Sequence, residues 1–422
     1  MNEQADVIVI GAGVAGLAAA RALAEQGARV IVLEAGERVG GRVWSMRDFA
    51  GIPVEAGAEF IHGSGAATWQ AIRAAGLQTR YVPQIRNSWF NLGGHTRWLP
   101  LHLAHPAVWR SFDVLRALRR TREDQTAAAF VASRRYRGRA RELVELTLTA
   151  HLPGRADEIG TLGLVADGIL HLEQGRNHRV LDGYDCLPRH LAGGLDVRLG
   201  RRVTTIGWGQ AGVQVRTADG DTFAAAAGIT SLPHGVLASG AVDFEPPLPS
   251  AKAEAIAEIR TGAVVKVLLR FDERFWPRRM AQLVCGSGPV TLYWAPAFGA
   301  GGPPVLTAYA TGARARVLSQ VAAQRASELV LDDLARLFPQ ARPHRLIRDV
   351  RHIDWLSDPR ARGGYTFLPS GGAAARAALA ADDTGTLLWA GGATVWSPIA
   401  DTVEAAYLSG LAAARRGGEI LS

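Results

Sequence analysis

Three glycines near the start of the chain have the spacing of a phosphate-binding turn. Gly11, Gly13 and Gly16 form a GxGxxG pattern directly after residues 6–10, a short run rich in β-branched residues. An alanine-rich segment of high helix propensity follows at residues 17–26. The glycines would let the backbone approach a pyrophosphate, which the free N–H groups and dipole of a helix N-terminus favour. The pattern predicts a buried strand, a phosphate turn and a helix.

A second strand and an acidic residue complete this unit. Residues 29–34 are a second predicted buried strand that ends in an acid, and this acid, Glu34, can accept hydrogen bonds from a ribose diol. A lone GxGxxG is weak evidence, but strand, turn, helix, strand and acid in this order are the context that a dinucleotide-binding unit requires. Gly40, Gly41 and Arg42 follow, and they would place a guanidinium over the same pyrophosphate. We therefore predict a bound dinucleotide.

This N-terminal block resembles the flavin amine oxidase family, which includes monoamine and polyamine oxidases, amino-acid oxidases and histone demethylases. In that family a GGR element in this place binds FAD. The resemblance implies an α/β fold with a Rossmann-like FAD-binding domain and a discontinuous second, substrate-binding domain of α+β type. The FAD-binding domain would comprise residues 1–65, 181–260 and 376–422. The substrate-binding domain would comprise a mostly helical insertion at 66–180 and a mixed sheet within 261–375.

The resemblance also implies FAD contacts near the C-terminus. A last predicted strand ends at Gly391 and Gly392, and a final helix begins near residue 401. In the family this helix points its N-terminus at the flavin pyrimidine carbonyl. Gly392 stands where the family usually has an acid, so one ribityl contact would be absent. The residues implied to bind FAD are Gly11, Ala12, Gly13, Gly16, Glu34, Ala35, Gly40, Gly41, Arg42, Gly57, Ala58, Val203, Gly391, Gly392, Thr402 and Val403.

Lysine is almost absent from the chain, which draws attention to the two that remain. Lys252 and Lys266 are the only lysines among 47 lysine and arginine residues. A GC-rich bacterial coding bias would produce this ratio, and a surviving lysine is then a position where arginine does not fit. Lys266 lies in the predicted strand 262–271. In the family a lysine on this strand holds a water that contacts flavin N5, so Lys266 is a candidate catalytic residue; the alternative is an edge-strand charge.

Aromatic and polar residues of the resembling segments indicate a substrate site. Tyr365 matches one wall of the aromatic cage that faces the flavin, and it is the second candidate catalytic residue. His62 matches a residue that lines the substrate tunnel in polyamine oxidases, although an ordinary hydrogen-bonded histidine is equally compatible. The other candidates for lining the substrate site are Glu59, Trp355 and Thr402. Glu59 would meet a cationic substrate, and Thr402 replaces the second aromatic wall of many members. Trp355 could instead be an ordinary residue of the hydrophobic core.

Together these features imply oxidative deamination of an amine, with hydride transfer to flavin N5. The substrate would be a polyamine or another primary or secondary amine, and the products an imine, then an aldehyde. The acceptor would be molecular oxygen, which gives hydrogen peroxide, or another electron acceptor. Gly364 stands where some members attach FAD through a cysteine, so we expect non-covalent FAD. An L-amino-acid oxidase or related FAD oxidoreductase remains an alternative, although residues 58–63 contain no arginine for an α-carboxylate. A non-catalytic FAD-binding interaction protein is a third possibility.

Composition limits the remaining classes of function. The net charge is +8, but the arginines are scattered, so we expect no nucleic-acid partner. Two isolated cysteines exclude a disulfide framework or a paired-cysteine metal site, and we expect no metal. No apolar stretch approaches the length of a membrane span, and the N-terminus lacks a basic signal region. We therefore expect a cytoplasmic protein, whose oligomeric state the sequence leaves open.

Overall fold

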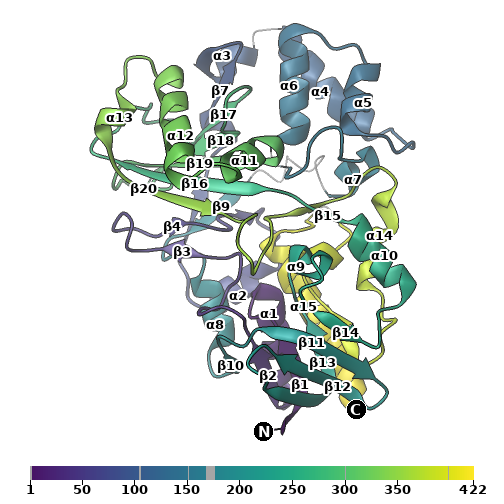
Figure 1. Cartoon of the computed structure of the whole chain (residues 1–422). Helices are drawn as coiled ribbons and strands as arrows, with labels where there is room; N and C mark the ends of the chain where they lie inside the picture. Colours follow the sequence, from purple (N-terminus) through teal and green to yellow (C-terminus); the bar gives the residue numbers. More distant parts are fainter. Residues whose placement is uncertain (1, 104–105, 151, 168–175, 300, 398) are drawn as a thin grey trace.

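The computed structural model describes residues 2–103, 106–150, 152–167, 176–299, 301–397 and 399–422. Its strands form two large sheets, one beside the two chain termini and one toward the opposite end of the molecule (Figure 1). Helices accompany both sheets. The fold class is therefore mixed α/β, as the sequence predicted.

The first sheet contains strands from both ends of the chain. Their order is β10-β2-β1-β13-β12-β11-β14, with β22 paired to β13. The pairs β10–β2, β2–β1, β1–β13 and β13–β22 are parallel, so their carboxyl ends meet at one edge, where ligands bind in open α/β sheets. The bounds are β1 (Asn2–Ile10), β2 (Val30–Leu33), β10 (Asp196–Arg198), β11 (Val203–Gly209), β12 (Gly212–Thr217), β13 (Thr222–Thr230), β14 (Asp243–Glu245) and β22 (Leu387–Trp389).

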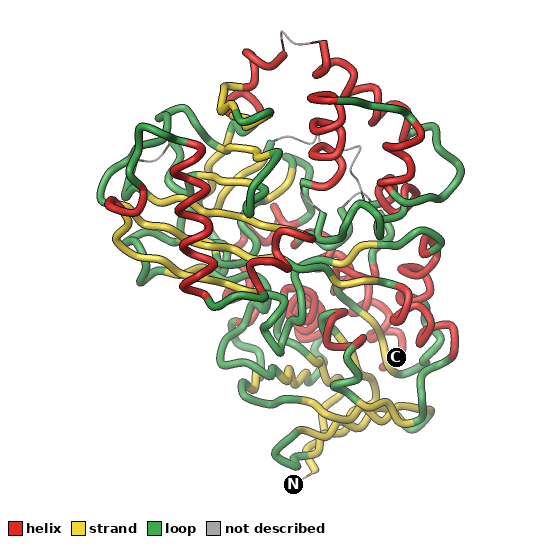
Figure 2. Tube along the Cα trace, turned by 45° about the horizontal axis from the view of Figure 1, so that its top comes forward, coloured by secondary structure: helices red, strands yellow, loops and turns green. Residues whose placement is uncertain are grey.

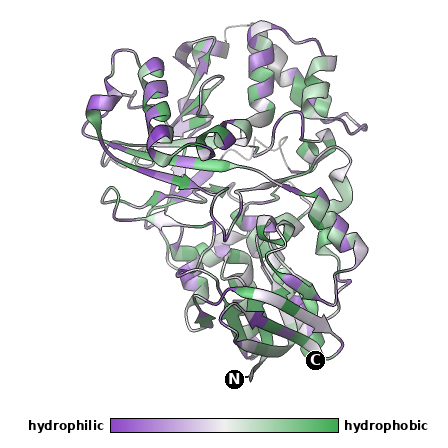
Figure 3. Cartoon of the chain, viewed as in Figure 1, coloured by the Kyte–Doolittle hydropathy of each residue, from purple (hydrophilic) through white to green (hydrophobic). Residues whose placement is uncertain are grey.

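Both faces of this sheet are covered, which explains the continuous apolar runs. Val7 and Val9 belong to a core cluster with the helices α1 (Val14–Glu25), α8 (Cys186–Ala192) and α15 (Val403–Leu421). Ile8 and Ile10 point to the other face and pack with α10 (Ser250–Glu258) and α14 (Ala375–Ala380). The strands beside the N-terminus accordingly include many hydrophobic residues in Figure 3.

Helix α15 packs closely along α1, and glycines permit the approach. A Cβ on Gly410 would lie 2.2 Å from the carbonyl oxygen of Ala15, and one on Gly417 would lie 3.5 Å from Leu23. The two contacts have nearly the same offset in sequence, so the helices run parallel. Along the common helix direction, the N-terminus of α15 therefore extends roughly six residues, or about 9 Å, beyond the N-terminus of α1. This end of α15 points toward the second sheet.

The second sheet has the order β20-β16-β19-β18-β17-β7-β8. One face packs against α11 (Gly312–Ser319) and α12 (Ala323–Leu337), and Figure 2 shows a long helix across these strands. The other face packs against residues 49–56. Lys266 lies in β16 between two residues of this second face, Val264 and Leu268. The bounds are β7 (Ser88–Leu92), β8 (His95–Trp98), β16 (Val264–Phe271), β17 (Gln282–Cys285), β18 (Leu292–Trp294), β19 (Val305–Thr311) and β20 (Ile347–Asp354).

The segment 66–180 is helical only in part. Its helices are α2 (Thr68–Ala74), α3 (Leu99–Leu103), α4 (Pro106–Leu118), α5 (Ala127–Ser133), α6 (Gly138–Thr149) and α7 (Thr161–Ala166). The expectation of a mostly helical insertion was wrong for residues 79–98, which contain β6 (Thr79–Val82), β7 and β8, and for the end of the segment, which contains β9 (Asn177–Val180). These strands are short, and β7 is paired with the distant β17, so local periodicity could not reveal it.

Small elements connect the two sheets. β5 (Ile61–His62) and β6 both pair with β9 (Asn177–Val180), β3 (Ser45–Met46) pairs with β4 (Val54–Glu55), and β15 (Arg260–Thr261) pairs with β21 (Thr366–Phe367). The short helices are α9 (His234–Ala238) and α13 (Pro343–Leu346). In the part of the chain that the structure describes, no helix has both the length and the apolar character needed to cross a membrane.

Candidate active site

The glycine-rich turn between β1 and α1 has room for a ligand on one side. Gly11 has a φ of +101°, and a Cβ on Gly16 would lie 2.0 Å from the carbonyl oxygen of Gly11. A Cβ on Gly13, in contrast, would meet no atom within 4 Å. Gly40 forms a bridge to Gly13, and the φ of Gly41 is +54°. Two backbone turns thus meet at an open helix N-terminus, an arrangement that fits the pyrophosphate of a dinucleotide.

Glu34 links the end of β2 to this turn. Its Oε2 accepts a hydrogen bond of 2.8 Å from the N–H of Ala12, and its Oε1 accepts one of 2.7 Å from Gly36, just past Ala35. A carboxylate has about four acceptor positions, so this side chain could still accept a hydrogen bond from a ribose hydroxyl. Val203 begins β11 and is buried, and its backbone pairs with Thr217. Its proposed adenine contact remains a prediction.

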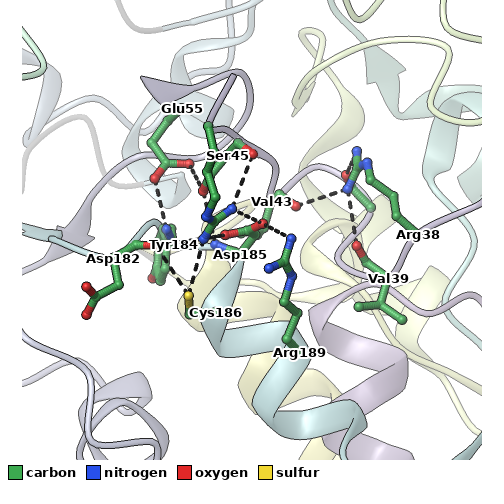
Figure 4. A network of polar contacts seen from close by, with 12 residues as sticks. Arg38, Val39, Val43, Ser45, Glu55, Asp182, Tyr184, Asp185, Cys186 and Arg189 are labelled. Carbon is green, nitrogen blue, oxygen red and sulfur yellow. Dashed lines mark hydrogen bonds and ion pairs between the residues drawn. The ribbon is translucent and has the colours of Figure 1, made fainter. Parts of the chain in front are cut away.

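Arg38 and Arg42 have different roles in the loop after β2. Arg38 donates hydrogen bonds of 2.7–3.2 Å to the carbonyl oxygens of Val39, Gly41 and Val43, so it shapes the loop (Figure 4). Arg42 donates to the carbonyl oxygen of Gly364. Arg42 therefore ties the phosphate turn to the residue that precedes Tyr365. The sequence pattern singled out Arg42 but assigned no role to Arg38.

Residues 55–58 are held between the phosphate loop and the second sheet. A Cβ on Gly57 would lie 1.9 Å from the carbonyl oxygen of Arg42, which accepts a 2.9 Å hydrogen bond from the N–H of Ala58. On the other side the indole of Trp355 donates a 3.1 Å hydrogen bond to the carbonyl oxygen of Ala56. Trp355 is buried, and its hydrogen bond to Ala56 helps to fix the position of this segment.

Lys266 fixes the same segment from β16. Its Nζ donates to the carbonyl oxygens of Glu55 at 2.9 Å and Gly57 at 2.7 Å, and it lies 3.4 Å from Oε2 of Glu59. An ammonium has three N–H donors, and here each has an acceptor. Burial lowers the pKa of Lys266, and the charge of Glu59 opposes this shift. A water held by Lys266 at flavin N5, as the resemblance implies, would have to share or replace one of these contacts.

Glu59 is enclosed by donors. Arg179 donates to its Oε1 at 2.8 Å, and the indole of Trp294 donates to its Oε2 at 2.8 Å. The side chains of Glu59 and Arg179 are 3% and 9% exposed, so this is a buried ion pair. The carboxylate therefore already has three partners. The suggested contact of Glu59 with a cationic substrate stays a prediction, and the substrate would have to compete with these donors. Sequence reasoning missed Arg179 and Trp294, because only the fold brings these distant residues to Glu59.

The surroundings of Glu55 connect the segment to α8. Ser45 donates a 2.7 Å hydrogen bond to Oε2 of Glu55, and the N–H of Tyr184 donates one of 2.8 Å to Oε1 (Figure 4). Burial raises the pKa of Glu55 to about 8. The guanidinium of Arg47 lies 2.7 Å from the carboxylate of Asp185, and Arg47 is the more exposed of the two. Glu55 thus anchors the segment to Ser45 and to Tyr184, just before α8, and its burial favours the protonated form.

His62 and a group of aromatic rings lie beyond Glu59. Nδ1 of His62 is 2.9 Å from Oδ1 of Asn177, and burial lowers the pKa of the imidazole. The residue is nevertheless exposed in the structure, so its ring is accessible to a ligand. Phe60 packs edge-on to Trp294 at 5.9 Å, and Trp294 lies 5.3 Å from Tyr309.

Tyr365 joins this aromatic group through Tyr309. The two phenols interact, and burial raises the pKa of both. Tyr309 lies opposite Lys266 in the pairing of β16 with β19. The structure thus brings together Lys266 and Tyr365, which are 99 positions apart in sequence, and adds Tyr309, which the sequence analysis did not select.

At the start of α15 the backbone offers hydrogen-bond donors, whereas the side chain of Thr402 is already hydrogen-bonded. Thr402 is its N-cap: its hydroxyl accepts from the N–H of Ala405 at 3.1 Å and donates to the carbonyl oxygen of Ile399 at 2.6 Å. The threonine hydroxyl is therefore used within the helix start. The N–H groups of Val403 and Glu404 belong to the first turn, which lacks intrahelical acceptors. Gly391, at the end of the preceding strand, has a φ of +130° and no atom within 4 Å of a Cβ placed on it.

Comparisons with known proteins identify relatives that are similar in sequence or fold. Polyamine oxidase 4 of Oryza sativa subsp. japonica is 31% identical over 97% of this chain and 87% of that protein. Lysine-specific histone demethylase 2 of Homo sapiens is 28% identical over 96% of this chain and 52% of that protein. Putrescine oxidase bound to putrescine shares the fold with a TM-score of 0.83 at 21% identity, covering 100% of this chain and 99% of that chain. For cyclohexylamine oxidase from Brevibacterium oxydans IH-35A the TM-score is 0.84 at 22% identity, with 97% and 99% covered.

The family model for flavin containing amine oxidoreductases matches residues 14–416, nearly the whole chain. This range includes α1, the residues around Lys266 and Tyr365, and most of α15. The chain therefore belongs to the flavin-containing amine oxidoreductases, and it is an FAD-dependent amine oxidase.

Proposed function

We propose that Tyr365, Lys266 and the first turn of α15 surround the reacting centre of this amine oxidase. FAD, when bound, accepts a hydride from the carbon next to the amine nitrogen. Tyr365 and its aromatic neighbours orient the amine in a desolvated space, where the neutral amine with a free lone pair is favoured over the ammonium. The N–H groups and dipole of α15 stabilise negative charge that develops beside them. The imine product hydrolyses to an aldehyde, and oxygen as acceptor gives hydrogen peroxide.

Lys266 contributes by holding the segment 55–59 against the reacting centre. Its contacts with Glu55, Gly57 and Glu59 support this positioning role. Water at flavin N5, held by the same ammonium, is a further part of the proposal. The observation that carries the proposal is the convergence of Lys266, Glu59 and Tyr365 on the segment next to the phosphate turn.

We further propose that the substrate is a small primary or secondary amine with one nitrogen at the site. A second nitrogen, as in a polyamine, would need a carboxylate of its own to replace water. Glu59 is already paired with Arg179 and Lys266, so it does not supply one. The aromatic group of Phe60, Trp294 and Tyr309 suits an apolar substituent instead.

An amino-acid oxidase is the second candidate, and Arg179 is the observation that bears on it. This arginine lies beside Phe60, with the guanidinium 4.8 Å from the ring, and it would be the clamp for an α-carboxylate. Arg179 is already paired with Glu59 at 2.8 Å, but Glu59 also pairs with Lys266, so one carboxylate serves two cations. The amino-acid oxidase therefore stays the second candidate, and the substrates compared below decide between the two.

Peroxide release from a panel of substrates tests these alternatives. n-Butylamine and putrescine have the same carbon chain and differ only in the second nitrogen, so their ratio of kcat/KM measures the preference for one nitrogen. Norvaline keeps the carbon chain of n-butylamine and adds the α-carboxylate. We expect n-butylamine to exceed both by at least about 10-fold. A preference for putrescine would identify a polyamine oxidase, a preference for norvaline an amino-acid oxidase, and no turnover of any panel member would favour a non-catalytic FAD-binding protein.

The compartment and source are also proposals. Both cysteines are free, which suits a reducing compartment, so we propose the cytoplasm. The replacement of nearly all lysine by arginine supports a bacterial source.

A further inference from the structure

Asp401 is a buried carboxylate with only one of its oxygen atoms in use. Its side chain is 5% exposed. Oδ2 accepts a 2.8 Å hydrogen bond from the N–H of Thr366 and one from the Thr366 hydroxyl, and it lies 3.6 Å from the guanidinium of Arg376. Oδ1 is buried and has no hydrogen-bond partner among the described residues. Because a buried acceptor without a donor is costly, this oxygen requires an explanation.

The position of Asp401 depends on the absence of a side chain at Gly392. A Cβ on Gly392 would lie 2.7 Å from Cα of Asp401 and 2.9 Å from its Oδ1. The two residues are also joined by a 3.3 Å hydrogen bond from the N–H of Asp401 to the carbonyl oxygen of Gly392. Asp401 itself has a φ of +57°, which is uncommon for a residue other than glycine. Gly392 and Asp401 therefore compete for one volume, and Asp401 fills it with a carboxylate.

This carboxylate is close to the expected path of the second half of the cofactor. The open turn at Gly13 would take the pyrophosphate, and the start of α15 lies about 9 Å further toward the second sheet. Asp401 immediately precedes the N-cap Thr402 of α15. The cofactor beyond the pyrophosphate consists of a ribityl chain, whose hydroxyls are donors, and the flavin ring, which carries an N–H. Gly391, next to Gly392, borders open space.

We propose that Asp401 is a cofactor-binding residue whose Oδ1 accepts a hydrogen bond from the ribityl–flavin half of FAD. The contacts with Thr366 and Arg376 hold the carboxylate in place and leave Oδ1 directed at the ligand. A purely structural role is the competing explanation, in which Asp401 only neutralises the fully buried Arg376. Asp167 offers a matched control, because it also pairs with Arg376, at 2.9 Å, but does not contact Gly392.

The test is the FAD dissociation constant of the holoenzyme, measured by ultrafiltration over a dilution series with flavin fluorescence of the filtrate. Asp401→Gly suits the positive φ and removes the carboxylate. Loss of a hydrogen bond to a charged acceptor should raise the dissociation constant about 10- to 100-fold. Asp167→Asn should leave it within about 3-fold of the wild type.

The proposal is overturned if Asp401→Gly binds FAD as the wild type does, or if Asp167→Asn weakens binding equally. An Asp401→Asn variant that keeps the wild-type affinity while Asp401→Gly loses it would assign the effect to the start of α15 and would also overturn the proposal. Asp401→Asn is the second variant should Asp401→Gly yield no holoenzyme. It keeps the shape but removes the charge, so we expect a rise of at least about 5-fold in the dissociation constant; an unchanged value contradicts the proposal.

Discussion

At the scale of the residue, both lysines of the chain direct buried ammonium groups at backbone carbonyl oxygens. Lys266 contacts those of Glu55 and Gly57. Lys252 contacts the carbonyls of Leu379 and Ala381, each at 2.9 Å, near the end of α14, and lies 2.9 Å from Asp383. A compact ammonium fits such a ring of acceptors, whereas a planar guanidinium does not. This geometry gives a physical reason for lysine at two positions in an arginine-rich chain.

Lys266→Met should slow reduction or reoxidation of the flavin while the protein stays yellow. Methionine fills the volume, but it leaves Glu59 without one of its cations and the segment 55–59 without its anchor. We expect a change of at least about 10-fold in one of the two rate constants, measured by stopped-flow absorbance. Lys252→Met is the matched control and should change neither rate. Unchanged rates in Lys266→Met would remove this residue from the mechanism.

Lys252→Met should instead destabilise the fold. The side chain is fully buried, and its loss removes donors from the end of α14 and the cation beside Asp383. Because Asp383 is 31% exposed, we expect a loss on the order of 2 kcal/mol rather than the larger cost of a fully buried pair. Thermal unfolding of the holoenzyme measures it. A variant as stable as the wild type would show that the carbonyl contacts contribute little.

Glu55 should make stability depend on pH. Its pKa is about 8 in the fold because of burial, above the value of an unfolded chain. The folded state then binds more protons than the unfolded state between about pH 4.5 and 8, so stability falls as pH rises through this range. Glu55→Gln resembles the neutral form and should gain at least about 1 kcal/mol relative to the wild type between pH 5 and pH 8. A stability difference that stays constant with pH would contradict this.

At the scale of the element, the N-terminus of α15 is set by Thr402. Thr402→Ala removes the hydroxyl that accepts from Ala405, and it should cost about 1 kcal/mol of stability. Thr402→Ser keeps the cap and should be close to the wild type. Thermal unfolding with saturating FAD compares the two variants. Equal stability of both would mean that the hydroxyl does not cap the helix.

An element could be predicted from the sequence when its own residues determine its structure, and not when a distant strand does. The apolar strands β1, β2 and β22 and the glycine turn carry their own signal, because buried parallel strands need continuous β-branched runs. β7 carries no such signal: Ser88–Leu92 is a strand because β17 pairs with it. Gly392 is an intermediate case. The sequence indicated a lost ribityl contact there, and only the structure shows Asp401 occupying the adjoining volume.

At the scale of the whole molecule, the candidate site joins segments that are far apart in the chain. The phosphate turn, Lys266, Tyr365 and α15 could be found from the sequence, since motif spacing and family resemblance point to each. Arg179, Trp294, Tyr309 and Asp401 could not, because each is defined by contacts between elements. The predicted FAD-binding domain consists of residues 1–65, 181–260 and 376–422. The strands of the first sheet all lie in these three ranges, but the division of the chain into two domains stays a prediction.

The most direct measurement for the whole account is anaerobic mixing of the purified yellow holoenzyme with n-butylamine, followed by admission of air. The account predicts that the flavin absorption bleaches without oxygen, that butyraldehyde forms, and that the yellow colour returns with release of peroxide. A protein that carries no FAD, or whose flavin no amine reduces, would contradict it.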